Sequence, residues 1–158
     1  MKKIGPVVSL FIPVLFLIVF SLPPICFSEQ PNPKVWEPLG TTSSGGHYFN
    51  KKNIIKSSNI VSVWTYHIVK DDERKKGVEL IKKYDFKKSI KFQNYDHNLI
   101  LMEIDCNKRL YRGKKFIYYD NMGKVLESDS YKNSKGETIQ PDTPIEELYE
   151  KVCVTQYH

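Results

Sequence analysis

The residues of this chain best suited to chemistry are three cysteines and four histidines. A cysteine thiolate can attack a substrate when a base and an orienting group lie beside it. It can instead bind a metal, but zinc sites need several ligands at ordered spacing, such as paired cysteines or the pattern HExxH. Two cysteines can also oxidise to a disulfide. The histidines are scattered singly and give no such ligand spacing: His47, His67, His97 and His158.

The N-terminal segment indicates the compartment, and the compartment decides which fate of the cysteines is favoured. Two lysines precede an almost uncharged apolar stretch over residues 4–20, and two prolines follow it. This layout is typical of a secretory signal peptide, and we predict cleavage after Ser28. Two alternatives stay open. The stretch is only slightly shorter than the about 20 residues of a membrane anchor, and Cys26 could carry a lipid, although bulky or rigid residues precede it.

Removal of residues 1–28 leaves two cysteines, Cys106 and Cys153, in an exported chain. An even pair in an oxidising compartment predicts one disulfide. The bond would close a long loop and, by the chain-entropy estimate, stabilise the fold by about 4 kcal/mol. A nucleophilic Cys106 served by His67 or His97 remains the alternative, because the sequence does not place these histidines in space.

The chain divides into a signal peptide over residues 1–28, a polar lead-in over 29–46 and a single domain over 47–158. The lead-in is rich in proline, glycine and small polar residues, and we expect Trp36 to dock on the domain. From His47 onward, β-rich runs are separated by the polar breaks "KKN" and "SSN". In Asn59–Val69 both sets of alternating positions are mostly apolar or β-branched, which predicts an interior strand or one covered on its second face.

In residues 70–91 the hydrophobic residues recur at the spacing of a helix. Acidic residues stand at the start of this segment and lysines toward its end, and the pattern predicts a helix over 73–84. The segment holds nine basic and five acidic residues. Such a surface would suit an anionic partner, for example a sulfated glycan, an acidic protein or lipid headgroups. The interspersed acids equally suit a solvated amphipathic helix with internal ion pairs. The candidate basic patch consists of Lys75, Lys76, Lys82, Lys83, Lys87 and Lys88.

The second half of the chain predicts a meander followed by a helix. We expect strands over 99–104, 109–119 and 124–128, joined by turns at "DCNK" and "DNMG". Thr143 as N-cap, Pro144 at the first helical position and Glu146 closing a capping box predict a helix over 144–152. The expected fold class is α+β: a small antiparallel meander sheet of about six strands, one inserted helix and a C-terminal helix tethered by the disulfide.

The carboxylates and tyrosines could have either structural or functional roles. Glu103, Asp105 and Asp120 could be paired for acid–base chemistry, but Asp105 and Asp120 fall at turns, where aspartate stabilises the backbone. Tyrosines suit cross-strand pairs or an aromatic binding surface, and Tyr131 in a polar loop is expected to be exposed. The patterns GxSxG, GxGxxG, P-loop and calcium loop do not occur. We predict no catalytic residues, no metal and no cofactor.

Several motifs in order along the chain resemble the surface-adhesin protein E family of bacterial exported proteins. They are Trp36, "HYFN", "IVSVWTY", "LILMEIDCNKRLYR", "YYDNMGKVLES" and "IEELYEKVC". The resemblance covers essentially the whole predicted mature chain, and it departs at Asn50, where relatives usually place an aspartate. Beside the two cysteines, the positions that carry it are Trp36, Trp64, Tyr111, Asp120 and Gly123.

The resemblance implies a small antiparallel sheet with a C-terminal helix held by the cysteine bridge, and no catalytic residues. For the family's name-giving members it implies display at the cell surface and binding of host matrix and plasma proteins. We therefore expect an exported binding module of the periplasm or outer cell surface. Its partner would be an unknown macromolecule, such as an anionic glycan or extracellular protein, and not nucleic acid. A membrane would be contacted only through an uncleaved N-terminal segment.

Two other functions stay open: an envelope structural or accessory protein without a host partner, and a periplasmic enzyme. A deep pocket lined by His67 or His97 with a carboxylate would favour the enzyme. A convex surface without a pocket, with its lysines in one patch, would favour binding.

Overall fold

Seven strands pair into one antiparallel sheet in the computed structural model, which describes residues 31–155. Six strands lie side by side in chain order, which makes the sheet a meander, and the short seventh strand pairs with β5. The predicted signal peptide and Cys26 lie outside the described residues. The strands are β1 (Trp36–Thr41), β2 (Gly45–Ser57), β3 (Ile60–Val69), β4 (Tyr95–Asp105), β5 (Leu110–Asp120), β6 (Val125–Ser130) and β7 (Glu137–Thr138).

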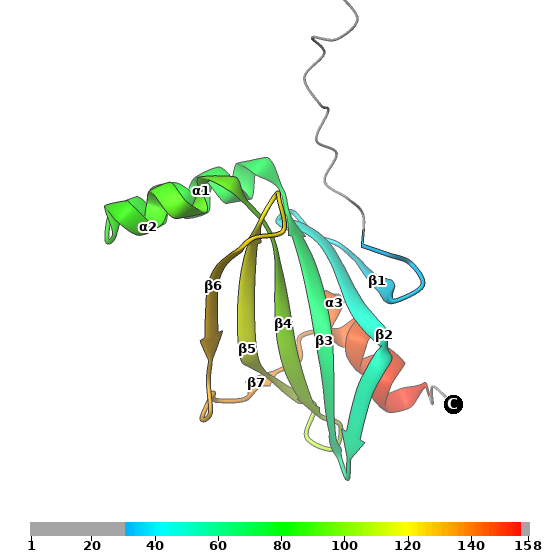
Figure 1. The fold of residues 1–158 in the computed structure, drawn as a ribbon. Coiled ribbons are helices and arrows are strands. Elements are labelled where there is room, and N and C mark those ends of the chain that lie inside the picture. The colour runs from blue at the N-terminus through cyan, green and yellow to red at the C-terminus, as the bar shows by residue number, and fades with distance from the viewer. Residues whose placement is uncertain (1–30, 156–158) are drawn as a thin grey trace, which may run out of the picture.

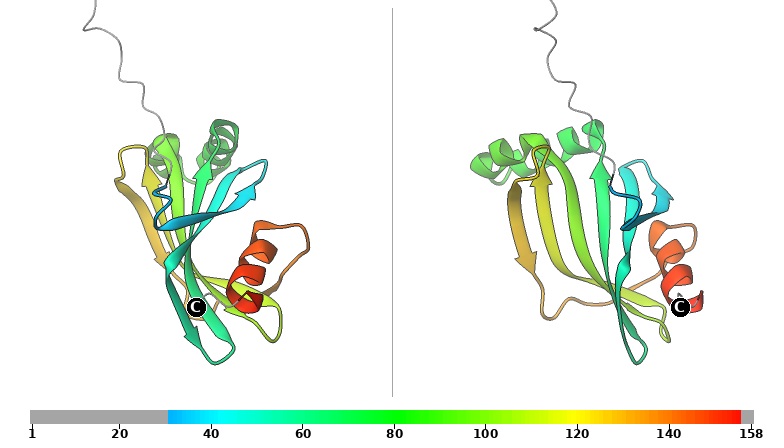
Figure 2. Two further views of the ribbon diagram at one scale, coloured as in Figure 1. Left: turned by 90° about the vertical axis from the view of Figure 1, so that its right-hand side faces the viewer. Right: turned by 45° about the vertical axis from the view of Figure 1, so that its right-hand side comes forward.

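Two helical segments complete the fold (Figure 1). A helical insert between β3 and β4 crosses one end of the sheet, and α3 lies behind the sheet in this view. Figure 2 shows α3 on one side of the sheet only. No helix within residues 31–155 is long and apolar enough to cross a membrane. The insert contains α1 (Asp71–Lys82), α2 (Phe86–Lys91) and the turn η1 (Phe92–Asn94), and α3 (Pro144–Tyr149) continues as the π-helical turn η2 (Glu150–Val154).

Alternation along the strands gives the sheet two different faces. One set of positions on β2, β3 and β4 is fully buried and forms the core against α3. The intervening positions are only half-buried. β3 is an interior strand between β2 and β4, as predicted. The buried sheet residues of the core are Phe49, Val61, Val63, Met102 and Ile104, with Leu39 on the edge strand β1.

The C-terminal helix begins and docks largely as the sequence predicts. The Thr143 hydroxyl accepts the N–H of Glu146 at 3.2 Å, and Pro144 occupies the first turn. The Glu146 carboxylate accepts from the N–H of Asp142, one residue before the position that a capping box would use. Leu148, Tyr149 and Val152 are buried against the sheet.

The predicted disulfide joins Cys106, in the β4–β5 turn, to Cys153 in η2, with the two Cα atoms 5.6 Å apart. Close by, the Tyr149 hydroxyl donates to the carbonyl oxygen of Cys106 at 3.3 Å. The bond therefore fixes the end of the helix to the β4–β5 turn. A nucleophilic Cys106 is wrong for this structure, because its sulfur is bonded to Cys153.

Three expectations differ from the structure. The predicted lead-in is partly sheet, since β1 and the start of β2 lie within residues 29–46. The "KKN" break is part of β2, where the register with β3 shifts between Phe49 and Ile54. The helix predicted over 73–84 is α1, which begins and ends two residues earlier, and a second, unpredicted helix follows it. Asp85 adopts an extended backbone, and its side chain accepts the N–H of Lys88 at the start of α2.

Loss of the disulfide should strongly lower the free energy of unfolding. A chain carrying both Cys106→Ala and Cys153→Ala loses the restriction that the bond places on the unfolded state, and we expect a loss of about 4 kcal/mol. Urea denaturation followed by circular dichroism measures it. The wild-type protein, exported and natively folded, should give no reaction with Ellman's reagent; two reactive thiols, or equal stability of the two proteins, would contradict the assignment.

Candidate functional site

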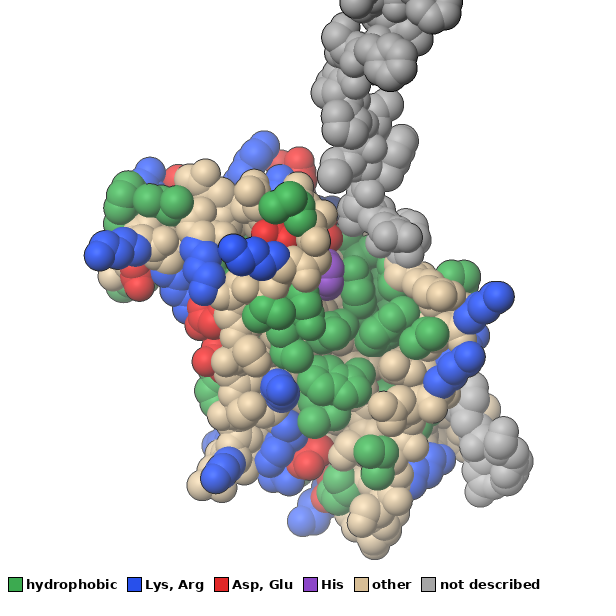
Figure 3. All heavy atoms as spheres, viewed as in Figure 1, with side chains coloured by type: hydrophobic (Ala, Val, Ile, Leu, Met, Phe, Trp, Pro, Cys, Tyr) green, Lys and Arg blue, Asp and Glu red, His purple; other side chains and the backbone are tan. Residues whose placement is uncertain are grey.

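Within residues 31–155, one face of the sheet has no helical layer, and its middle is apolar. We call this surface the open face, and Figure 3 shows its hydrophobic side chains gathered over the middle of the sheet. Trp64 on β3 pairs with Leu101 on β4, and Leu99 pairs with Ile117 on β5, so their side chains point the same way. All four are half-buried and contribute apolar area to the surface.

Charged side chains border the open face at the end near the β4–β5 turn. The Arg112 guanidinium lies 2.6 Å from a carboxylate oxygen of Glu103, and the Lys114 ammonium lies 3.9 Å from the same oxygen. An apolar centre with a polar border is the usual anatomy of a protein–protein interface.

At the opposite end of the open face, aromatic rings from four strands form a continuous stack. The His97 ring lies between Tyr66 and Tyr119, with ring centroids 4.6 Å and 4.8 Å away and interplanar angles of 10° and 11°. Trp36 on β1 meets Tyr66 edge-on at 5.3 Å, which confirms that this tryptophan docks on the domain. The stack holds the edge strand β1 to the centre of the sheet through side chains as well as backbone pairing.

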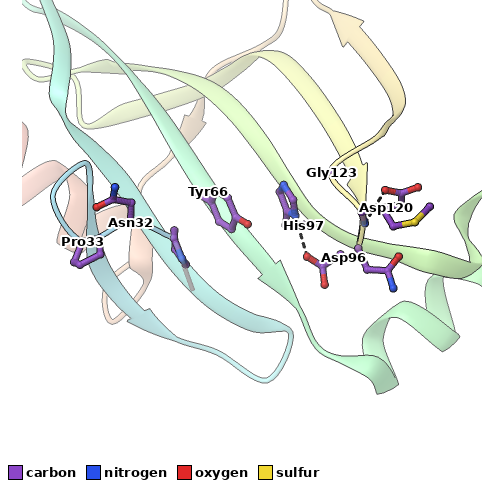
Figure 4. Close-up of a pocket in the computed structure, with 10 residues that line it drawn as sticks. Asn32, Pro33, Tyr66, Asp96, His97, Asp120 and Gly123 are labelled. Carbon is purple, nitrogen blue, oxygen red and sulfur yellow. Dashed lines mark hydrogen bonds and ion pairs between the residues drawn. The ribbon is translucent and has the colours of Figure 1, made fainter. Parts of the chain in front are cut away.

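A cavity of about 660 Å³ opens beside this stack. Figure 4 shows the Asp96 carboxylate directed at His97, where its oxygen lies 2.9 Å from Nδ1. The β5–β6 turn and the first described residues form the other walls. The lining residues are Pro31, Asn32, Pro33, Tyr66, Asp96, His97, Asp120, Asn121, Met122 and Gly123.

The second carboxylate of the cavity, Asp120, supports the β5–β6 turn. It is 6% exposed, and its Oδ1 accepts the N–H groups of Met122 at 3.0 Å and Lys124 at 2.8 Å. Gly123 has φ = 77°, a left-handed conformation that favours glycine. Both residues therefore have the turn role that the sequence favours. Asp105 is similar, since its Oδ1 accepts the N–H groups of Asn107 and Lys108.

His97 and Asp96 are placed like the base and the orienting group of a catalytic site. Few neighbouring groups, however, could act with them in a reaction. Both faces of the imidazole are covered by tyrosine rings, and Asp120 is occupied by the turn. The lining residues of the cavity include no serine, threonine or cysteine. The cavity can hold a polar group against Asp96, Asn32 and Asn121, so its geometry suits binding.

His67 lies away from this cavity, on the core side of the sheet. Its ring stacks on His47 at 4.3 Å, and the two Nε2 atoms lie 3.3 Å from the Ser44 hydroxyl and 3.0 Å from the Thr42 hydroxyl. Burial lowers the pKa of His47; burial and, to a smaller extent, the charge of His47 lower the pKa of His67 to about 4. Residues 31–155 contain no cluster of three or more potential metal ligands.

The residues of the candidate basic patch all lie on the helical insert, but half of them have acidic partners. Lys76 pairs with Glu73 at 2.7 Å, Lys82 with Glu79 at 3.5 Å, and Lys88 with Glu127 at 2.7 Å. The amphipathic-helix interpretation therefore accounts for these three. The other three lysines of the patch, Lys75, Lys83 and Lys87, are exposed, and none of them has an ion pair within residues 31–155.

The family positions are divided between the two faces. Trp36 and Trp64 lie on the open face, whereas Tyr111 lies against the core and donates its hydroxyl to Glu137 at 2.9 Å. Sequence reasoning did not predict the His97 stack. The alternation of His97, Leu99 and Leu101 places them on one face of a strand, but the pairing register that brings Tyr66 and Tyr119 beside His97 is not contained in that pattern.

Comparison with protein-family models gives one finding: the model described as Surface-adhesin protein E matches residues 36–154. The match begins at the first residue of β1 and ends at the last residue of η2. It therefore spans the whole sheet and the tethered helix. A search of the curated proteins finds no match.

Acid should destabilise this protein through the histidine pair. The pKa of His67 is about 4 in the folded protein and about 6.5 in an unfolded chain, so the unfolded state binds protons first as the pH falls. Its contribution to stability is present above about pH 6.5 and is lost as the pH falls toward 4. Urea denaturation at several pH values measures this loss, and His67→Gln should have a flatter profile between pH 6.5 and 4. Identical profiles for the wild type and His67→Gln would contradict this prediction.

Proposed function

We propose, from the premise that the chain belongs to the surface-adhesin protein E family, that it is an exported binding module whose open face contacts a protein. The partner is extracellular or belongs to the cell envelope, and the module itself lies in the periplasm or on the outer cell surface. No catalysis is part of this function.

One observation carries the proposal: the sheet has a helical layer on one face and an apolar surface on the other. Trp64, Leu99 and Leu101 lie on the face that no helix of residues 31–155 covers, and they are half-buried. Exposed apolar area of this kind on a soluble domain marks sites that contact other molecules. Tryptophan and tyrosine, both present here, are the side chains that most often dominate the binding energy of protein interfaces.

The rigidity of the open face also suits a protein partner. Its residues come from neighbouring interior strands, so their positions are fixed by backbone pairing. A rigid surface loses little conformational entropy on binding. The ion pairs at its border, such as Arg112 with Glu103, remain in water and would set orientation more than affinity.

Catalysis is the second candidate, and the His97–Asp96 pair beside the cavity is the observation that favours it. The cavity holds His97 and a carboxylate, which is the combination expected of an enzyme. Binding ranks first because the imidazole is enclosed between two tyrosine rings and the Asp120 carboxylate is occupied by backbone N–H groups.

A charge placed in the middle of the open face should abolish binding. Leu101→Glu puts a carboxylate among apolar side chains, and we expect at least a tenfold loss of affinity, as at an interface hot spot. The probes are two coated surfaces, an extracellular-matrix extract and envelopes of the producing bacterium, with bound protein measured by biosensor.

Two matched variants complete this experiment. Val154→Glu makes the same kind of exchange at an exposed residue outside the open face, and His97→Phe keeps a flat ring in the stack but removes its proton chemistry. Both should bind as the wild type does, within about twofold. If the wild type binds neither surface, or if Leu101→Glu binds as well as the wild type, the open face is not the binding site. Catalytic turnover that His97→Phe abolishes would favour an enzyme.

A further inference from the structure

We propose that the far end of the helical insert is a membrane-contact site that takes an anionic lipid bilayer. This inference is independent of the open face and concerns a different surface. The insert tip, as we call it, is the part of α1 and α2 around their junction. It combines exposed apolar side chains with lysines: Leu80, Tyr84, Phe86 and Ile90, with Lys83, Lys87 and Lys91.

The apolar side chains of the insert tip are far more exposed than folding requires. Tyr84 is 85% exposed, Phe86 61%, Leu80 55% and Ile90 53%. These are four of the nine large hydrophobic residues exposed in residues 31–155, gathered within one short segment. Figure 3 shows hydrophobic and basic side chains side by side at this end of the insert.

Helical spacing makes α2, the second helix of the insert tip, amphipathic. Phe86 and Ile90 are four residues apart in α2 and share one side of it, while Leu80 lies in the last turn of α1 and Tyr84 follows in the turn between the helices. Lys87 and Lys91 have the same spacing and form the adjacent stripe. Apolar side chains with lysines beside them are the pattern of segments that lie in the interfacial layer of a bilayer.

The opposite side of the insert already holds it to the sheet. Phe92 is 5% exposed and Ser89 2%, and the Lys88 ammonium pairs with Glu127 on β6 at 2.7 Å. The apolar side chains of the insert tip are each more than half exposed, so most of their area lies outside this attachment. These side chains are therefore available for contact with another molecule.

The charge of the insert tip selects an anionic surface. Residues 79–91 hold five lysines against Glu79 and Asp85. Glu79 pairs with Lys82, and the Asp85 carboxylate accepts the N–H of Lys88 at the start of α2. Lys83, Lys87 and Lys91 remain for an external partner, since none has an ion pair in the described part of the chain.

Size and chemistry favour a bilayer over other anionic partners. A stable protein interface uses about 20–30 residues on each side, and the insert tip offers only seven. A sulfated glycan would use the lysines but leaves Tyr84 and Phe86 unexplained. A bilayer surface uses both, because aromatic rings settle at the headgroup level and lysines are attracted to anionic lipids.

The base of the insert lies beside the point where the described chain begins. Pro31 and Asn32 line the same cavity as Asp96 at the start of β4, directly after the insert. If the apolar stretch over residues 4–20 is retained as an anchor, or Cys26 is lipid-modified, the anchored segment joins the domain at this end of the molecule. The insert tip would then add a second contact to that anchor.

Vesicle binding by the protein recovered from its producing cells tests the proposal. The probes are vesicles of phosphatidylcholine with about 30% phosphatidylglycerol, and vesicles of phosphatidylcholine alone, in a flotation assay. We expect binding to the anionic vesicles that weakens in high salt because charges are screened. The triple variant Lys83→Gln, Lys87→Gln, Lys91→Gln should bind about 100-fold more weakly, and Tyr84→Ser with Phe86→Ser at least tenfold more weakly.

Matched controls separate the insert tip from general charge and from loss of folding. Lys56→Gln, Lys108→Gln and Lys135→Gln remove the same charge from exposed lysines outside the insert and should leave vesicle binding unchanged. Circular dichroism checks that each variant is folded. A reporter variant, Phe86→Trp, should show a blue-shifted difference spectrum and quenching by brominated lipids, which an N-terminal anchor alone would not produce.

Several outcomes would overturn the proposal. They are equal binding to both kinds of vesicle, equal weakening by the control variant, and a Phe86→Trp spectrum unchanged by anionic vesicles. Retention on heparin that depends on the three lysines, without vesicle binding, would assign the insert tip to a soluble polyanion instead. Each result is distinct from failure of the open face, because Leu101→Glu leaves the insert tip unaltered.

Discussion

The covalent bond between Cys106 and Cys153 is the constraint on which the two-sided character of this domain depends. A short helix such as α3 is not stable by itself in water, and it buries Leu148 and Val152 only if it stays over one face of the sheet. The bond holds it there from the β4–β5 turn, and the Tyr149 hydroxyl adds a hydrogen bond at the same place. With a single helical layer fixed to one face, the other face has no cover from within residues 31–155.

The surfaces that remain exposed then follow from the connections of the meander. Short turns join most strands, and the exception is the β3–β4 connection, which carries α1 and α2 across one end of the sheet. The open face offers a rigid apolar area with charged borders, and the insert tip offers a small amphipathic projection (Figures 1 and 3). The open face is built from paired interior strands, and the insert tip from two short helices with lysines that have no ion pair within residues 31–155. We propose partners of different kinds for them, a protein in one case and a lipid surface in the other.

The family positions explain the fold better than they explain the binding. Asp120 and Gly123 build the β5–β6 turn, Tyr111 supports the core, and Trp36 holds the edge strand through Tyr66. Only Trp64 adds directly to the middle of the open face. The family match therefore accounts for the scaffold, whereas the exposed side chains of this chain select its partner.

The sequence alone determined the local structure: the alternation of β3 and β4, the turns at Asp105 and Asp120, and the start of α3 at Thr143. It also indicated the disulfide, because an even pair of cysteines in an exported chain has few other fates. Only the tertiary structure decided that Tyr66, His97 and Tyr119 form one stack, that His67 is separated from it, and that Trp64 faces outward. These relations depend on strand register and on which face α3 covers, and both arise from contacts between residues distant in the chain.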